Sequence, residues 1–130
     1  MLRENYYCID SGYRRDVEVV HSIFDIFVLP STNPDPLPTV VLEAMASGKP
    51  VVGYKHGGIC EMVKDGYNGL LADVNKPIDL AEKIDVIISN NELRKTMGER
   101  SRQRLLEKFS YDSYVKNFSD EYERLSNIKR

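Results

Sequence analysis

Residues 26–47 read IFVLPSTNPDPLPTVVLEAMAS, and this stretch decides the fold. Its first four residues form a continuous apolar run, which is typical of a strand buried on both faces in a parallel sheet. A loop rich in Pro, Asn and Asp follows over residues 31–38. Thr39 is a candidate N-cap, because its hydroxyl can accept a hydrogen bond from a free amide of the first turn of a short, largely apolar helix over residues 40–47. A buried strand followed by a covered helix indicates a layered α/β fold.

The same alternation continues on both sides of this stretch. Upstream, residues 6–9 predict a short strand, and Asp16 can cap a helix that extends to residue 24. Downstream, Gly48 can end the short helix because it is free to take positive φ. The elements that follow are strands over 50–53 and 69–72 with a helix over 59–64 between them, then helices from Pro77, over 92–108 and from Ser110.

This order predicts a Rossmann-like parallel sheet with C-terminal helices, because consecutive parallel strands joined through helices form a right-handed α/β layer. No linker or repeat divides the 130 residues. We therefore expect one domain over residues 1–130, in which residues 92–130 form a helical tail.

Composition excludes several classes of function. The formal net charge is −2, and no basic stripe alternates with aromatic residues, which argues against nucleic acid as a partner. No apolar run has the length that spans a bilayer, and the first residues lack the apolar core of a signal peptide, so we expect a cytoplasmic protein. Cys8 and Cys60 have no metal-ligand spacing and are interpreted as structural thiols, and no metal site is expected.

The loop after the first buried strand is the candidate site, because open parallel sheets bind ligands beyond the carboxyl ends of their strands. A helix N-terminus favours a phosphate, and a carboxylate can accept two hydrogen bonds from a vicinal diol. Asp35 in the loop and Glu43 in the helix could therefore hold the two sugars of a nucleotide-sugar. Spacing alone leaves a structural alternative open, in which Glu43 complements the helix dipole and Asp35 forms a turn.

Four sequence blocks carry a resemblance to a known family. They are DIFVLPS at 25–31, VLEAMASGKPVV at 41–52, GGI at 57–59 with Glu61, and DGYNGLL at 65–71. In this order they resemble the family 4 (group 1) glycosyltransferases of the GT-B fold. The resemblance covers residues 12–111 and corresponds to the C-terminal, donor-binding domain of that family.

The resemblance implies roles for individual residues. Asp35 would be catalytic, because the family's acid at this position binds the transferred sugar and stabilises charge near its anomeric carbon. Glu43 would bind the ribose hydroxyls. The other donor-binding residues would be the amides of Leu37, Thr39 and Val40 beside Pro38, facing the sugar and phosphates, and Tyr13 near the nucleobase.

The chain also departs from the family pattern. Asp35 stands where the family usually has Glu, one methylene longer, and Cys60 stands where it usually has proline. The family's glycine-rich strand segment, with its Arg and Lys for the diphosphate, is not found before Tyr6. On this basis we expect an N-terminally truncated donor domain that lacks its N-terminal acceptor domain and is inactive alone.

The implied parent activity is the retaining transfer of a hexose from a nucleotide diphosphate sugar to a sugar or lipid-linked acceptor, as in polysaccharide biosynthesis. No cofactor or metal is expected besides the donor, and peripheral membrane association is open for the parent. Two alternatives also stay open. One is a non-catalytic nucleotide-sugar-binding module that works with a separate acceptor-domain subunit, and the other is a structural domain whose site has decayed.

Two further expectations concern the strand at 26–29 and the loop that holds His56. By the resemblance, the strand at 26–29 loses its natural neighbour, which leaves unpaired amides and carbonyls. Either residues 6–9 pair with it directly, or a second copy pairs along it to form a homodimer. His56 lies in a loop beside Gly57 and Gly58, where a solvated histidine is favoured over a donor contact.

Overall fold

The computed structural model describes residues 12, 15–16, 20, 23–36, 38–109, 120 and 123–125. The strand predicted at residues 6–9 and the helix predicted from Ser110 lie outside these residues. Two described bonds lie within the helix predicted from Asp16, and one of them, from the amide of Ile23 to the carbonyl of Val20 at 3.3 Å, joins residues three apart. The amide of Val20 donates to the carbonyl of Asp16 at 3.1 Å, which is the spacing of an α-helical bond.

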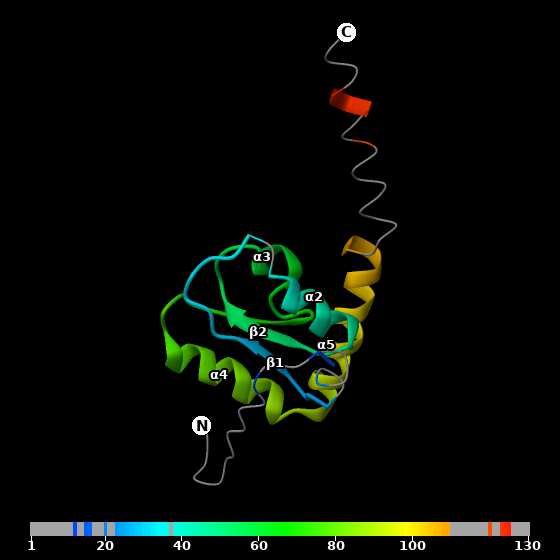
Figure 1. Ribbon diagram of the computed structural model, residues 1–130. Coiled ribbons are helices and arrows are strands. Elements are labelled where there is room, and N and C mark those ends of the chain that lie inside the picture. Colours follow the sequence, from blue (N-terminus) through cyan, green and yellow to red (C-terminus); the bar gives the residue numbers. More distant parts are fainter. Residues whose placement is uncertain are drawn as a thin grey trace.

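A parallel sheet forms the centre of the fold (Figure 1). Its described strands are β1 (Phe27–Leu29), β2 (Val51–Tyr54) and β3 (Gly69–Ala72), in the order β1-β2-β3. Phe27 pairs with Val51, and Val51 pairs with Gly69. The predicted parallel α/β class is therefore confirmed, and the strand predicted at residues 69–72 has the predicted bounds.

Helices cover both faces of the sheet, as Figure 1 shows. Helices α2 (Thr39–Ala46) and α3 (Ile59–Met62) pack on one face, and α4 (Pro77–Ile88) packs on the other. Neighbouring residues of β2 pack into the cores on opposite faces of the sheet, because successive side chains in a strand point to opposite faces. Val51 belongs to the core under α2 and α3, whereas Val52 belongs to the core over α4.

Helix α5 (Asn91–Arg104) continues into a π-helical turn, η1 (Leu105–Phe109), and ties the two layers together. Met97 of α5 packs in the core with α4, and Phe109 of η1 packs against the core under α2. Two arginines of α5 also reach carbonyl groups at the ends of other helices. Arg102 Nη1 donates to Ala46 O at 2.7 Å, while Arg104 donates to Met62 O at 2.9 Å and to Glu61 O at 2.8 Å.

Several predicted helix boundaries are wrong. The helices predicted to end at residues 47 and 64 end at Ala46 and Met62. Pro38, not Thr39, is the N-cap of α2, and its φ of −73° and ψ of 92° suit the fixed proline ring. Thr39 is thus the first helical residue, and no side chain caps this helix. The single helix predicted at 92–108 is instead α5 followed by η1, and the side chain of Asn90 caps α5 by accepting from the amide of Leu93.

Strand β1 forms one of the two outer edges of the described sheet. This strand pairs with β2 on one side, and no other strand borders it among the described residues. Its three residues are half-buried. Because residues 6–9 lie outside the described part, pairing of that segment or of a second copy with β1 stays a prediction.

Candidate functional site

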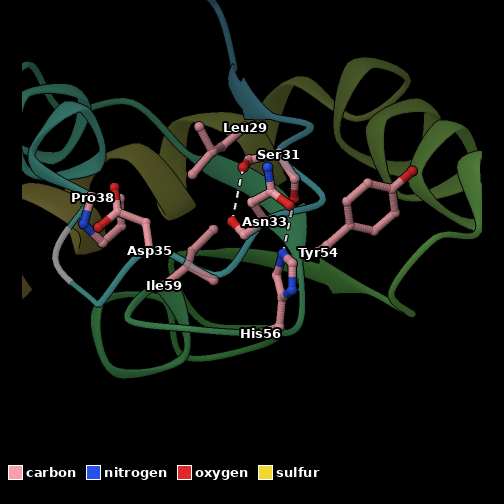
Figure 2. Close-up of a pocket in the computed structure, with 8 residues that line it drawn as sticks. All are labelled: Leu29, Ser31, Asn33, Asp35, Pro38, Tyr54, His56 and Ile59. Atoms are coloured by element: carbon pink, nitrogen blue, oxygen red, sulfur yellow. Dashed lines mark hydrogen bonds between the residues drawn. The ribbon is translucent and has the colours of Figure 1, made fainter.

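Two loops meet at the carboxyl ends of β1 and β2. Because the two strands are parallel, residues 30–38 and residues 55–58 leave the sheet at the same edge. Together they surround a small pocket, shown in Figure 2. Its enclosed space is about 10 Å³, which has room for one water molecule. The lining residues are Leu29, Ser31, Asn33, Asp35, Pro38, Tyr54, His56 and Ile59.

Hydrogen bonds join the first loop to the second at two places. The amide of Gly58 donates to the carbonyl oxygen of Asp35 at 2.7 Å. The Nε2 atom of His56 lies 2.9 Å from the carbonyl oxygen of Ser31. Within the first loop, the hydroxyl of Ser31 donates to the carbonyl of Asn33 at 3.0 Å. The loop that carries Asp35 is therefore attached to the segment after β2 at Ser31 and at Asp35.

The two glycines allow this attachment because the loops touch backbone to backbone. A Cβ added to Gly57 would lie 2.8 Å from Asp35 O and 2.9 Å from Asp35 N, and φ at Gly57 is +71°, where side chains are strained. A Cβ added to Gly58 would collide with the carbonyl of Pro36. The Gly57-Gly58 pair is thus required for the position of the acidic loop.

The N-terminus of α2 begins directly after this loop. The amides of Thr39 and Val40, as the first two of the helix, have no acceptor one turn back within it. Both residues are exposed, whereas Pro38 before them is buried. The positive end of the helix dipole therefore opens to solvent next to the Asp35 loop.

Glu43 lies on the exposed face of the same helix. The buried face consists of Val41, Ala44 and Met45, so Glu43 shares the solvent side with Thr39 and Val40. It is the fifth helical residue, and the first turn of α2 holds no acidic residue. Because the dipole effect fades beyond the first turn, this position weakens the interpretation of Glu43 as a mere dipole partner.

The predicted site residues fall into three groups. Asp35 and Pro38 line the pocket, where Figure 2 shows them together on one side. Thr39, Val40 and Glu43 lie on the exposed face of α2. Leu37 and Tyr13 lie outside the described residues.

Sequence reasoning underrated His56. Instead of a solvated loop side chain, it is a half-buried residue that contacts the acidic loop. Its place at the end of an apolar strand, directly before two glycines, was the available signal. Two other features of the described part bear on function. No cluster of three His, Cys, Asp or Glu residues there suits a metal ion, and none of its helices is long and apolar enough to cross a membrane.

Comparison with known proteins identifies the family. Residues 1–104 match the model of the family described as Glycosyl transferases group 1, and the chain belongs to this family.

Curated relatives agree with this assignment. The chain is 49% identical over 87 residues to an uncharacterized glycosyltransferase of Methanocaldococcus jannaschii, which is 67% of this chain and 24% of that protein. It is 33% identical over 103 residues to the lipopolysaccharide core biosynthesis glycosyltransferase LpsE of Rhizobium meliloti, which is 79% of this chain and 30% of that protein. The chain thus spans less than a third of the length of these relatives.

Solved structures share the fold. A crystal structure of Anabaena HepE in complex with UDP-glucose superposes with a TM-score of 0.79 at 28% identity, over 87% of this chain and 31% of that one. The C-terminal domain of the group 1 protein LpcC from Francisella tularensis gives a TM-score of 0.68 at 26% identity, over 82% of this chain and 53% of that one. The predicted GT-B fold is thereby confirmed.

Proposed function

We propose that this chain forms the donor-binding side of a retaining glycosyltransferase that moves a hexose from a nucleotide diphosphate sugar to a sugar or lipid-linked acceptor. One observation carries the proposal. The Asp35 loop is held at the strand ends directly before the exposed start of α2, with Glu43 on the same open face. The HepE structure with UDP-glucose supports a donor of this class.

The start of α2 is the proposed diphosphate site. Thr39 and Val40 are exposed residues, their amides have no acceptor within the helix, and the helix dipole favours negative charge there. These amides can donate hydrogen bonds to the diphosphate oxygens, and the proposed chemistry uses no metal ion or cofactor besides the donor. Leu37, Pro38 and Tyr13 complete the proposed donor set.

The two carboxylates divide the two sugars between them. Glu43 lies four residues into α2, about 6 Å along the helix from Thr39, which suits contact with the ribose on one side of the diphosphate. Asp35 lies before the helix, on the other side, and is proposed to hold the transferred hexose. As the catalytic residue it would stabilise positive charge that develops at the anomeric carbon as the bond to phosphate breaks.

The partners follow from the same arrangement. Asp35 and the start of α2 form one wall of a site, and sugar transfer requires a second wall that binds the acceptor and excludes water. An acceptor domain is the proposed source of that wall, and a peripheral membrane contact would bring a lipid-linked acceptor to it.

Titration calorimetry tests the proposal. The full-length protein is titrated with nucleoside diphosphates and with the corresponding nucleotide-hexoses. We expect one nucleotide-hexose to bind more tightly than its nucleoside diphosphate, since Asp35 adds contacts to the sugar. If no member of the panel binds, the proposal is contradicted. Binding without transfer to any sugar or lipid-linked acceptor would favour the non-catalytic module instead.

A further inference from the structure

We propose that His56 is a positioning residue that fixes the Asp35 loop in its donor-binding conformation. This inference rests on the proposed function of Asp35 and adds a residue to that site. His56 lies in the loop that follows β2, whereas Asp35 lies in the loop that follows β1, so the contact joins segments that are far apart in sequence. Figure 2 shows the imidazole of His56 pointing toward Ser31 and Asn33.

The hydrogen bond assigns the role of the Nε2 atom of His56. Ser31 contributes a carbonyl oxygen, which can only accept, so Nε2 of His56 must carry the proton across the 2.9 Å separation. Because Nε2 is occupied by the loop, it is not available to a donor sugar. With Nε2 engaged by the loop, we assign the effect of His56 to the loop and not to contact with the reacting atoms.

The ring is itself held in place. The aromatic ring of Tyr54 meets it edge to face, with centroids 6.5 Å apart and an interplanar angle of 89°. Tyr54 is buried and belongs to β2, so its contact with the imidazole orients the ring relative to the sheet. A side chain oriented by the core is suited to fix a neighbouring loop.

Two ties then define the loop between them. His56 holds the carbonyl of Ser31, and the amide of Gly58 holds the carbonyl of Asp35, four residues later. Pro34 lies within this span, and its fixed φ removes one of the remaining rotations. Of these two hydrogen bonds, loss of the first would leave the one at Asp35, so the direction of the Asp35 side chain would be less restricted.

The amide of Gly58 is a reporter that needs no ligand, because its hydrogen-bond acceptor belongs to the loop. We measure its hydrogen exchange by NMR in the wild type, His56→Ala and His56→Gln. His56→Ala should speed exchange of the Gly58 amide by about tenfold, as expected for the loss of one supporting hydrogen bond. His56→Gln should restore most of the protection, since its side-chain amide can donate to Ser31 O.

The amide of Leu71, which donates to the carboxylate of Asp65 elsewhere in the fold, is the internal control and should be unchanged. Equal Gly58 exchange in the wild type and His56→Ala would overturn the proposal. Equal acceleration at Gly58 and Leu71 would overturn it as well, because it would show a general loss of stability.

Donor binding supplies the second readout. His56→Ala should weaken binding of the nucleotide-hexose by about fivefold to tenfold and leave the affinity for the nucleoside diphosphate unchanged. The reason is that Asp35 is assigned to the transferred hexose, which the nucleoside diphosphate lacks. In an Asp35→Asn background the same substitution should have no further effect. A loss that persists in this background would show that His56 contacts the donor directly, against the proposal.

The two readouts separate the two hypotheses. If the wild type binds no nucleotide-hexose, the proposed function fails, and the exchange of the Gly58 amide still decides whether His56 holds the loop. If the donor binds and His56→Ala changes neither readout, the positioning role fails and the proposed function stands.

Discussion

The carbonyl oxygen of Asp35 accepts a 2.7 Å hydrogen bond from the amide of Gly58. This carbonyl lies four residues before Thr39, the first residue of α2, where an acceptor would serve to extend the helix backwards. The bond turns it toward the loop after β2 instead. This contact between the segments after two neighbouring strands therefore contributes both to the start of the helix and to the place of the acidic loop.

The first prediction concerns Glu43. Glu43→Gln should weaken binding of the nucleoside diphosphate by about 1.5–3 kcal/mol, because a charge-assisted bond to the ribose diol is lost. Calorimetry measures the affinity, and urea unfolding should show an unchanged fold, since Glu43 is exposed. Glu82→Gln, at an exposed acid of α4, is the matched control. Equal affinity in wild type and Glu43→Gln would leave Glu43 without a role in binding.

The second prediction separates the two acids. Asp35→Asn should lower turnover and nucleotide-hexose affinity more than it lowers nucleoside diphosphate affinity, because Asp35 is assigned to the transferred sugar. Steady-state kinetics and calorimetry on the same preparation measure the two effects. A loss of the same size for the nucleoside diphosphate and for transfer would refute the division of roles between Asp35 and Glu43.

The third prediction concerns three glycines. They differ in whether a side chain would meet backbone strain, a close contact with the Asp35 loop, or both. Gly66 has φ of +82° with open space around it, Gly58 has an ordinary φ but faces Pro36, and Gly57 has both constraints. Gly66→Ala should cost about 1–2 kcal/mol of unfolding free energy and leave donor affinity unchanged. Gly58→Ala and Gly57→Ala should both reduce donor affinity, and Gly57→Ala should cost the most stability.

Urea unfolding and calorimetry on the three variants check these expectations. The turn at Gly66 precedes β3 and so lies at the amino ends of the parallel strands, whereas the candidate site lies at their carboxyl ends. Donor affinity that falls as much in Gly66→Ala as in Gly57→Ala would show that the contact with the Asp35 loop is unimportant.

The fourth prediction tests how Arg104 of α5 stabilises the end of α3. Arg104→Ala should lower the free energy of unfolding by about 1–3 kcal/mol, because the carbonyls of Glu61 and Met62 lose a charged donor. Arg104→Lys should recover only part of this, since an ammonium group lacks the planar fork of the guanidinium. Lys95→Ala, at an exposed position of the same helix, is the control, and an equal loss there would contradict the argument.

The sequence predicted the sheet well because its signals are local. The apolar run that became β1, the segment of β3 between turn residues, and Pro77 at the first position of α4 each have a cause within a few residues. The start of α2 was misplaced by one residue, because Thr39 is the better capping residue by composition and Pro38 is the one that the loop leaves extended.

The candidate site was predicted only in part. Asp35 and Glu43 could be chosen from the strand-loop-helix pattern and the family resemblance. The contacts of His56 and Gly58 with the first loop could not, because they join residues about 25 positions apart through the register of two strands. The π-helical end of α5 likewise depends on packing against the core under α2, not on a local sequence signal.

The two ties on the Asp35 loop have a thermodynamic consequence. Ordering a free loop on binding would oppose association with a loss of conformational entropy for every residue that is fixed. Here the loop between Ser31 and Asp35 is already fixed by His56 and Gly58 when the protein folds. Association with a ligand at this end of the sheet should then resemble docking to a rigid surface, with a heat-capacity change set by the buried area alone.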